Sequence, residues 1–243
     1  MKYIFSLTTI PSKFDNLYLT LNSLICQTIK PHKIILNLPK KYSFRFNDSI
    51  IDGDKIEKLY NTYKDDNLVI NILDNDIGPG TKLMGLFFNE IIDINELDYI
   101  VLVDDDLVYK QDMVENFKNF IQDKTVYVAS YHTYCYKNIV IGQGADGFFF
   151  KPETVSKILH YYNNIKTCKP LMLHDDFYFS FYFKEHEYEI VNIDYHDKPC
   201  YKKHEFSDID ALTLLQGKYK RRIKSYYDIM MEYKSNNYYE TIE

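Results

Sequence analysis

The chain has 243 residues, a formal net charge of -6, 46% hydrophobic residues and 26% charged residues. This length predicts a single domain, and the composition excludes both a disordered chain and a membrane-spanning one. The negative charge argues against a general nucleic-acid-binding protein, although residues 218–224 form a local basic run. We expect this run to be a solvated helix face, with peripheral contact to a membrane or an anionic polymer as the alternative.

Targeting signals are not evident in the sequence. No apolar stretch reaches the length of about 20 residues that a transmembrane helix requires. The segment Met1–Leu7 is too short for the apolar core of a signal peptide. We therefore expect a cytoplasmic protein.

Strands and helices alternate in the first half of the chain. The patterns predict, in order, a strand over residues 2–7, a helix over 15–26, a strand over 33–38, a strand over 68–73, a helix over 82–92 and a strand over 99–103. This order favours the α/β class, with a largely parallel sheet flanked by helices. Ligands of such sheets bind beyond the carboxyl ends of the strands, so the loops after these strands should together form one cleft.

The second half has a more mixed pattern. It predicts a helix over 112–122, a strand over 126–131, a glycine-bearing segment over 139–147 that enters Phe148–Phe150, a helix from Pro152 to about 162, an aromatic helix after His174 and a helical tail from Gly217. There are no internal repeats and no low-complexity linker, so we expect residues 1–243 to form one domain.

Three consecutive carboxylates, Asp104-Asp-Asp106, end the apolar run of residues 99–103. Such a run is typical of a buried central strand, and adjacent carboxylates repel each other unless a cation holds them. Alternation along a strand would place Asp104 and Asp106 on one side and Asp105 on the other. Mg²⁺ and Mn²⁺ are commonly bound by one or two carboxylates together with substrate phosphates. The triplet therefore indicates a metal and phosphate site, and a solvated acidic turn is the alternative.

A second acidic pair, Asp175-Asp176, stands at the start of the predicted aromatic helix, directly after His174. Acids at a helix N-terminus have a structural explanation, because they complement the helix dipole and cap free amides. Two adjacent acids cannot both act as the cap. The pair is therefore a second candidate for chemistry.

Four segments together resemble the GT-A fold glycosyltransferases, which use nucleotide sugars and carry a DxD metal motif. They are Ser6–Lys13, Leu21–Pro39, Asp74–Leu83 and Asp104–Asp106. The resemblance implies a Rossmann-like, mostly parallel sheet, with a nucleotide-sugar-binding half at 1–106, a mixed acceptor-binding half at 107–216 and a helical tail at 217–243. Each motif alone is only a weak indicator of this family. The resemblance is specific because the segments occur together in this order.

The resemblance also implies which residues contact the donor. The nucleotide and its diphosphate would be reached by residues of three loops, namely Thr8, Thr9, Ile10, Lys13, Asp74, Asp76, Lys82, Asp104 and Asp105. The metal, Mn²⁺ or Mg²⁺, would be bound by Asp104 and Asp106 and by a C-terminal histidine, for which His204 is preferred over His196. Lys13 stands where the family usually has arginine, which keeps the charge but loses the bidentate fork.

The activity that the resemblance implies is transfer of a sugar from a nucleotide sugar, with UDP as the nucleotide on family grounds, to a hydroxyl of a glycan or another acceptor. Inverting members carry a general base in an acidic pair before an aromatic helix. Asp176 is the preferred base here, with Asp175 as the alternative, and a neighbouring acid can raise its pKa toward the working pH. Gly144, Asp146 and His174 would face the sugar or the acceptor.

Other interpretations of the same acids remain. Asp104-x-Asp106 also fits the nucleophile motif of haloacid-dehalogenase-like phosphatases, although that motif normally stands near the start of a chain. A sugar nucleotidyltransferase would have a related site, but the glycine-rich, arginine-bearing loop of that group is absent after Leu7. A non-catalytic module that binds glycans is the third alternative.

Overall fold

The computed structural model describes residues 1–89, 91–122, 124–194, 200–211, 226–232 and 235. The basic run at 218–224, the alternative metal ligand His196 and most of the predicted C-terminal tail lie outside these residues. Within the described part of the chain, no helix is both long enough and apolar enough to cross a membrane.

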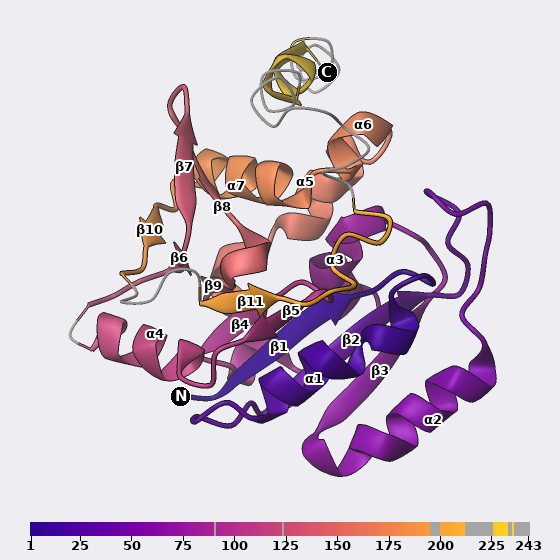
Figure 1. The fold of residues 1–243 in the computed structure, drawn as a ribbon. Coiled ribbons are helices and arrows are strands. Elements are labelled where there is room, and N and C mark those ends of the chain that lie inside the picture. The colour runs from indigo at the N-terminus through magenta and orange to yellow at the C-terminus, as the bar shows by residue number, and fades with distance from the viewer. Residues whose placement is uncertain (90, 123, 195–199, 212–225, 233–234, 236–243) are drawn as a thin grey trace.

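A seven-stranded sheet runs through the molecule (Figure 1). In spatial order its strands are β10 (Ile190–Asn192), β6 (Val128–Ser130), β9 (Phe148–Phe150), β4 (Tyr99–Leu102), β1 (Tyr3–Thr8), β2 (Lys33–Pro39) and β3 (Leu68–Leu73). Neighbouring strands are parallel except at β9, which runs antiparallel to both β4 and β6. The predicted α/β class with a largely parallel sheet is confirmed.

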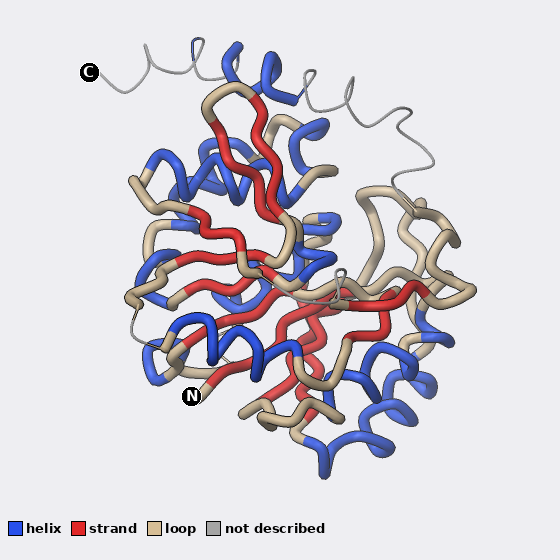
Figure 2. The backbone as a smooth tube through the Cα atoms, turned by 60° about the vertical axis from the view of Figure 1, so that its left-hand side comes forward, coloured by secondary structure: helices blue, strands red, loops and turns tan. Residues whose placement is uncertain are grey.

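Helices cover both faces of this sheet, as Figures 1 and 2 show. One core lies beneath α1 (Tyr18–Ile25) and α4 (Met113–Ile121), and the other beneath α3 (Thr81–Phe88), α5 (Ile158–Ile165) and α7 (Asp175–Glu185). Side chains alternate across each strand, so Phe149 packs into the first core while Phe148 and Phe150 pack into the second. The sheet is therefore buried on both sides, which explains its nearly continuous apolar sequence.

Several elements differ from the prediction. Helix α2 (Gly53–Tyr63) was not predicted, because it is rich in charge and buries only Tyr63. Its N-cap residue is Asp52, whose carboxylate accepts a hydrogen bond from the Asp54 amide at 3.0 Å. The hairpin of β7 (Thr133–Tyr136) and β8 (Ile139–Gly142) and the short helix α6 (Lys169–Met172) were also not predicted. The segment that starts at Pro152 is a 3₁₀ turn before α5 begins, so the helix predicted there starts later.

A small second sheet carries the C-terminal segment to the carboxylate triplet. β5 (Leu107–Tyr109) follows the triplet directly and pairs antiparallel with β11 (Tyr201–Lys203). In this register Lys203 lies opposite Leu107, the first residue after Asp106. The residues after β11 are thereby placed beside the triplet, although they are about a hundred positions away in the sequence.

The antiparallel strand β9 provides a test of the core. Phe149 has no exposed surface and stacks on Phe117 with ring centroids 4.1 Å apart. We expect Phe149→Ala to lower the free energy of unfolding by about 3 to 5 kcal/mol, because it leaves a cavity between the sheet and α4. Chemical denaturation would measure the loss. Ile50→Ala is the control, since Ile50 is 63% exposed, and a similar loss in both variants would contradict the assignment of the core.

Candidate active site

A cavity of about 350 Å³ lies at the carboxyl ends of the central strands. It is lined by most of the residues that the sequence predicted, namely Thr8, Thr9, Ile10, Lys13, Asp76, Lys82, Asp104, Asp105, Asp106, Asp175 and Asp176. A larger hollow of about 710 Å³ lies against α2 and β3, but none of the predicted site residues lines it. We therefore take the smaller cavity as the candidate active site.

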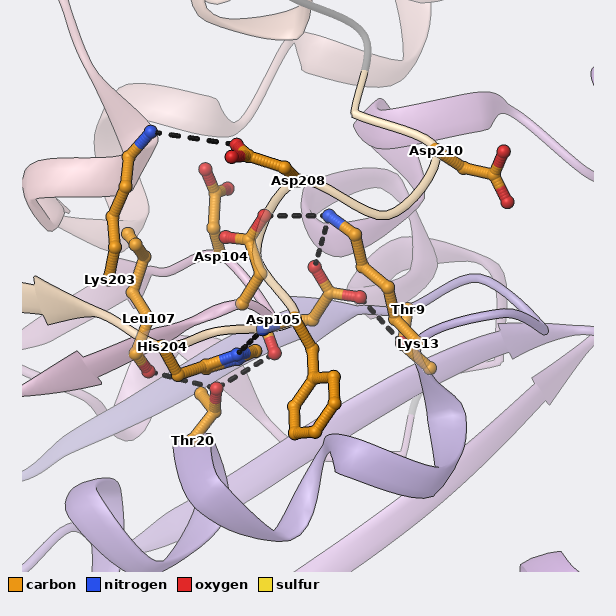
Figure 3. A network of polar contacts seen from close by, with 12 residues as sticks. Thr9, Lys13, Thr20, Asp104, Asp105, Leu107, Lys203, His204, Asp208 and Asp210 are labelled. Atoms are coloured by element: carbon orange, nitrogen blue, oxygen red, sulfur yellow. Dashed lines mark hydrogen bonds and ion pairs between the residues drawn. The ribbon is translucent and has the colours of Figure 1, made fainter.

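The carboxylate triplet lies in the loop after β4, where it is no longer part of the strand. The alternation expected of a strand does not describe it, because Lys13 approaches both Asp105 and Asp106. Its ammonium is 2.6 Å from Asp106 Oδ2 and 3.9 Å from Asp105 Oδ1, and Figure 3 shows it reaching into this network. The loop is therefore shaped by ion pairing rather than by the pleat of the strand.

Asp105 is the most enclosed member of the triplet, with a side chain that is 12% exposed. It accepts a hydrogen bond from the Thr9 hydroxyl at 2.5 Å. Burial and the negative charge of Asp106 raise its pKa to about 6, against the lowering effect of Lys13. The first loop of the chain and the triplet are thereby held together by hydrogen bonding and charge.

Lys82 joins the triplet to the second acidic pair. Its ammonium lies 2.8 Å from Asp104 Oδ1 and 2.8 Å from Asp175 Oδ2, and its side chain is only 4% exposed. Burial alone would lower the pKa of Lys82, but the two carboxylates outweigh burial and hold the pKa well above its ordinary value. The lysine is therefore a permanent buried cation between the two acidic segments.

Asp176 lies beside this ion pair at the start of α7 and is partly exposed. Its Oδ1 accepts a hydrogen bond from the Gly144 amide at 2.9 Å. Burial and the neighbouring charge of Asp175 raise the pKa of Asp176 well above its ordinary value. A Cβ at Gly144 would lie 2.8 Å from the Lys82 ammonium and 3.0 Å from Asp176 Oδ1, so any larger residue would displace these two groups. Asp176 thus has a raised proton affinity, and Lys82 pairs with Asp175 instead.

His204 follows β11 and faces the triplet loop (Figure 3). Its Nδ1 accepts a hydrogen bond from the Phe206 amide at 3.2 Å, and its buried Nε2 has no hydrogen-bond partner among the described residues. Burial lowers the pKa of the imidazole despite the nearby charge of Asp106, which favours the neutral form that binds metal ions. His204 is, however, not among the described residues that line the cavity.

The carboxylates of the triplet fit a metal ion that is bound jointly with a phosphate ligand. Among the described residues, no three Asp, Glu, His or Cys side chains converge closely enough to hold a metal ion alone. Asp104 and Asp106 line the cavity and offer oxygen ligands, and hard divalent ions commonly take their remaining ligands from water and substrate phosphates. The residues present thus fit a divalent cation whose coordination a diphosphate completes.

Two further loops form the wall of the cavity. The sequence analysis named His204 in the loop after β11 but did not identify the other loop. The segment Tyr42–Phe46 follows β2, and its Phe44 amide donates a hydrogen bond to Asp76 at 2.7 Å. Arg45 donates a hydrogen bond to the Asp210 carbonyl at 2.8 Å, which ties this segment to the chain beyond β11. The aromatic and arginine composition of Tyr42–Phe46 was the available signal, since such residues are enriched where ligands bind.

The structure places some predicted residues away from the cavity wall. Asp74 is ion-paired with Lys40 at 2.5 Å, and its side chain is 80% exposed. Asp146 is 5% exposed and His174 is 7% exposed, and neither lines the cavity. The His174 ring packs edge-on against Tyr226 at 5.0 Å. Among the predicted sugar-contacting residues, only Gly144 touches the site, through its bond to Asp176.

Comparisons with known proteins identify the fold. No family model matches the sequence, and no curated protein matches it. Solved structures of S. aureus TarS 1–349, alone, with UDP and with UDP-GlcNAc, each match with a TM-score of 0.55 and 13% identity, over 100% of this chain and 76% of that chain. The mostly parallel sheet and this likeness show an α/β fold of the GT-A type.

The raised pKa of Asp105 predicts how stability depends on pH. A carboxyl whose pKa is higher in the folded than in the unfolded state stabilises the fold at low pH, and this contribution is lost as the pH rises from near 4 through about 6. The Asp105→Asn variant has no titrating carboxyl at this position, so it does not lose this contribution to stability as the pH rises. We expect its free energy of unfolding, relative to the wild type, to increase by about 1 to 2 kcal/mol between pH 5 and pH 8.

Urea denaturation at the two pH values would measure this difference. The matched control is Asp15→Asn, since the Asp15 side chain is 66% exposed and pairs with Lys55 on the surface. Its stability relative to the wild type should stay within about 0.5 kcal/mol at both pH values. An Asp105→Asn difference that is the same at pH 5 and pH 8 would show that Asp105 titrates normally.

Proposed function

We propose that this protein is a metal-dependent glycosyltransferase that moves a sugar from a UDP-sugar to a hydroxyl group of a glycan or another acceptor, with inversion at the anomeric carbon. One observation carries the proposal. At the ligand-binding edge of a GT-A-type sheet, a DxD loop, two buried lysines and a proton-accepting carboxylate line a single cavity. The TarS structures that share this fold contain UDP and UDP-GlcNAc, which supports the choice of donor class.

The cavity holds more carboxylates than cationic side chains, so it suits a nucleoside diphosphate that binds together with a divalent cation. Lys13 and Lys82 extend into it from two sides, and Arg45 stands at its wall. The Tyr42 hydroxyl is buried beside the cavity and has no hydrogen-bond partner among the described residues, so it can serve a bound ligand. Asp106 would hold the divalent cation with Asp104 beside it, and His204 would join them if its side chain turned toward the cavity. A cation bound there supplies Lewis-acid stabilisation of the negative charge on the diphosphate.

The acidic pair supplies the proton acceptor. In the proposed reaction the acceptor hydroxyl gives its proton to Asp176, its oxygen forms a bond to the anomeric carbon, and the bond from that carbon to the diphosphate breaks. Burial and the charge of Asp175 raise the pKa of Asp176, so its carboxylate binds a proton more strongly than an ordinary aspartate does. Asp175 has a different role, since its ion pair holds Lys82 in place.

The phosphatase interpretation has less support. Asp104 is 35% exposed and its ion pair with Lys82 at 2.8 Å is compatible with either role, but the whole chain matches a GT-A-type structure. The glycan-binding interpretation would leave the raised pKa of Asp176 and the buried lysines without a role.

The donor-side prediction concerns Asp106. We expect the wild type to release nucleotide from a UDP-sugar in the presence of Mn²⁺ and an acceptor, and Asp106→Ala to lose this activity by about a hundredfold or more, because diphosphate stabilisation is lost. A panel of nucleotide sugars, with release measured with and without Mn²⁺, is the assay. Asp15→Asn is the control and should keep full activity.

Two other outcomes of this assay would overturn the proposal. Hydrolysis of a phosphomonoester through an aspartyl-phosphate at Asp104 would identify a phosphatase. Glycan binding without either activity would identify a binding module.

The acceptor-side prediction concerns Asp176. Asp176→Asn removes the proton acceptor but keeps an oxygen that can accept the hydrogen bond from the Gly144 amide. We expect kcat to fall by about 10² to 10⁴ while the affinity for UDP changes less than about twofold. Steady-state kinetics and calorimetric titration with UDP would separate the two effects. Unchanged kcat would exclude Asp176 as the base.

A further inference from the structure

Buried polar side chains cross three neighbouring strands beneath α3. Ser6 on β1, Asn37 on β2 and Asn71 on β3 are 0%, 0% and 2% exposed. The interior of a parallel sheet that is covered on both faces is normally apolar, as the other buried positions of these strands are. The three side chains, which we call the polar ladder, are therefore an exception that requires an explanation.

The polar ladder is a continuous chain of hydrogen bonds. The Asn71 amide donates to Asn37 Oδ1 at 2.8 Å, and the Asn37 amide donates to Ser6 Oγ at 2.9 Å. The Ser6 hydroxyl then donates to the main-chain carbonyl of Lys82 at 2.5 Å. The register of the sheet makes this possible, because Asn37 and Asn71 lie directly opposite each other.

A second attachment fixes α3 one turn further along. The Asn71 amide also donates to the main-chain carbonyl of Gly85 at 2.8 Å. Gly85 allows this approach, because a Cβ there would lie 2.4 Å from Asn37 Oδ1. Asn89, just after α3, donates to Asn71 Oδ1 at 2.7 Å. Helix α3 is thus bound to the sheet at two points along its length, and a third contact follows directly after its last residue.

Stability alone does not account for the polar ladder. Replacing both partners of a buried hydrogen bond with apolar groups of the same shape is often neutral. Hydrogen bonds differ from apolar packing in being directional, so they fix the position of a helix along and around its axis. That position matters here because Lys82 has little freedom: its ammonium contacts Asp104 and Asp175 at 2.8 Å each.

We propose that Ser6, Asn37 and Asn71 are positioning residues that hold α3 where the Lys82 ammonium reaches Asp104 and Asp175 at the same time. None of the three lines the cavity, so they act through Lys82. The effect on catalysis rests on the proposed transferase function. The positioning of Lys82 does not rest on it and can be measured separately.

The first experiment measures Lys82 directly. The variant is Asn37→Leu/Asn71→Leu, which replaces two polar side chains by apolar ones of similar size. Native protein is treated briefly with acetic anhydride, and acetylation is quantified for each lysine by mass spectrometry. In the wild type Lys82 should be nearly unreactive, because it is 4% exposed and paired. In the variant we expect its acetylation to rise about fivefold or more, through local opening of α3.

Two controls accompany this measurement. Lys13 is also buried, at 7% exposure, but the polar ladder does not contact it, so its acetylation should stay unchanged. Ile35→Ala removes apolar packing from the same face of β2 without removing a hydrogen bond, and it should leave the reactivity of Lys82 unchanged. Unchanged Lys82 reactivity in a folded Asn37→Leu/Asn71→Leu protein would overturn the proposal. If that variant does not fold, Ser6→Ala provides the same test with the loss of one hydroxyl.

The second experiment is a double-mutant cycle on kcat/KM with UDP-sugar as substrate. We expect Asn37→Leu/Asn71→Leu to lower kcat/KM by about tenfold to a hundredfold in the wild-type background, and less than about twofold when Lys82→Met is already present. Ile35→Ala should change kcat/KM by the same factor in the wild-type background and in the Lys82→Met background. Equal losses for the ladder variant in both backgrounds would show that the ladder does not act through Lys82. If the wild type transfers no sugar, the proposed function fails, and the acetylation experiment still decides the positioning.

Discussion

The buried ammonium of Lys82 is the interaction on which the arrangement of the site depends. It lies 2.8 Å from a carboxylate of the loop after β4 and 2.8 Å from a carboxylate at the start of α7. A buried charge that loses a partner is strongly destabilising, so each carboxylate fixes the position of the other through the lysine. The two acidic segments of the cavity are therefore held together by one cation on a third element, α3.

The cavity contains more buried negative charge than its lysines neutralise. Lys13 and Lys82 face the five carboxylates of Asp104–Asp106 and Asp175-Asp176. The excess is visible in the raised pKa values of Asp105, Asp106 and Asp176, to which burial contributes most and neighbouring carboxylates add. A site in this condition gains from added positive charge. A divalent cation can supply that charge beside Asp106, and a proton can supply it on Asp176. These are the roles of metal ligand and proton acceptor that the two residues have in the proposed reaction.

The sequence predicted those candidate site residues whose chemistry agreed with the periodicity of the strands. It missed the residues whose role depends on which residues lie opposite each other in the sheets. The triplet was found because the apolar run before it indicates a buried strand that must end at a sheet edge. A single asparagine in such a strand carries no comparable signal, because the role of Asn37 depends on Asn71 lying opposite it in the sheet. Similarly, Arg45 and Asp210 meet only because β11 pairs with β5. Contacts between distant segments therefore account for most of what the patterns did not predict.

The floor and the wall of the cavity are built in different ways. The floor consists of buried side chains on the sheet, α3 and α7, held by ion pairs and by the polar ladder. The wall consists of the loops at Tyr42–Phe46 and beyond β11, which are joined by the bond from Arg45 to the Asp210 carbonyl. Loops tolerate sequence change far better than a buried charged network does. In the proposed enzyme, the chemistry would therefore belong to the buried floor, and recognition of a particular donor and acceptor would belong to the loops.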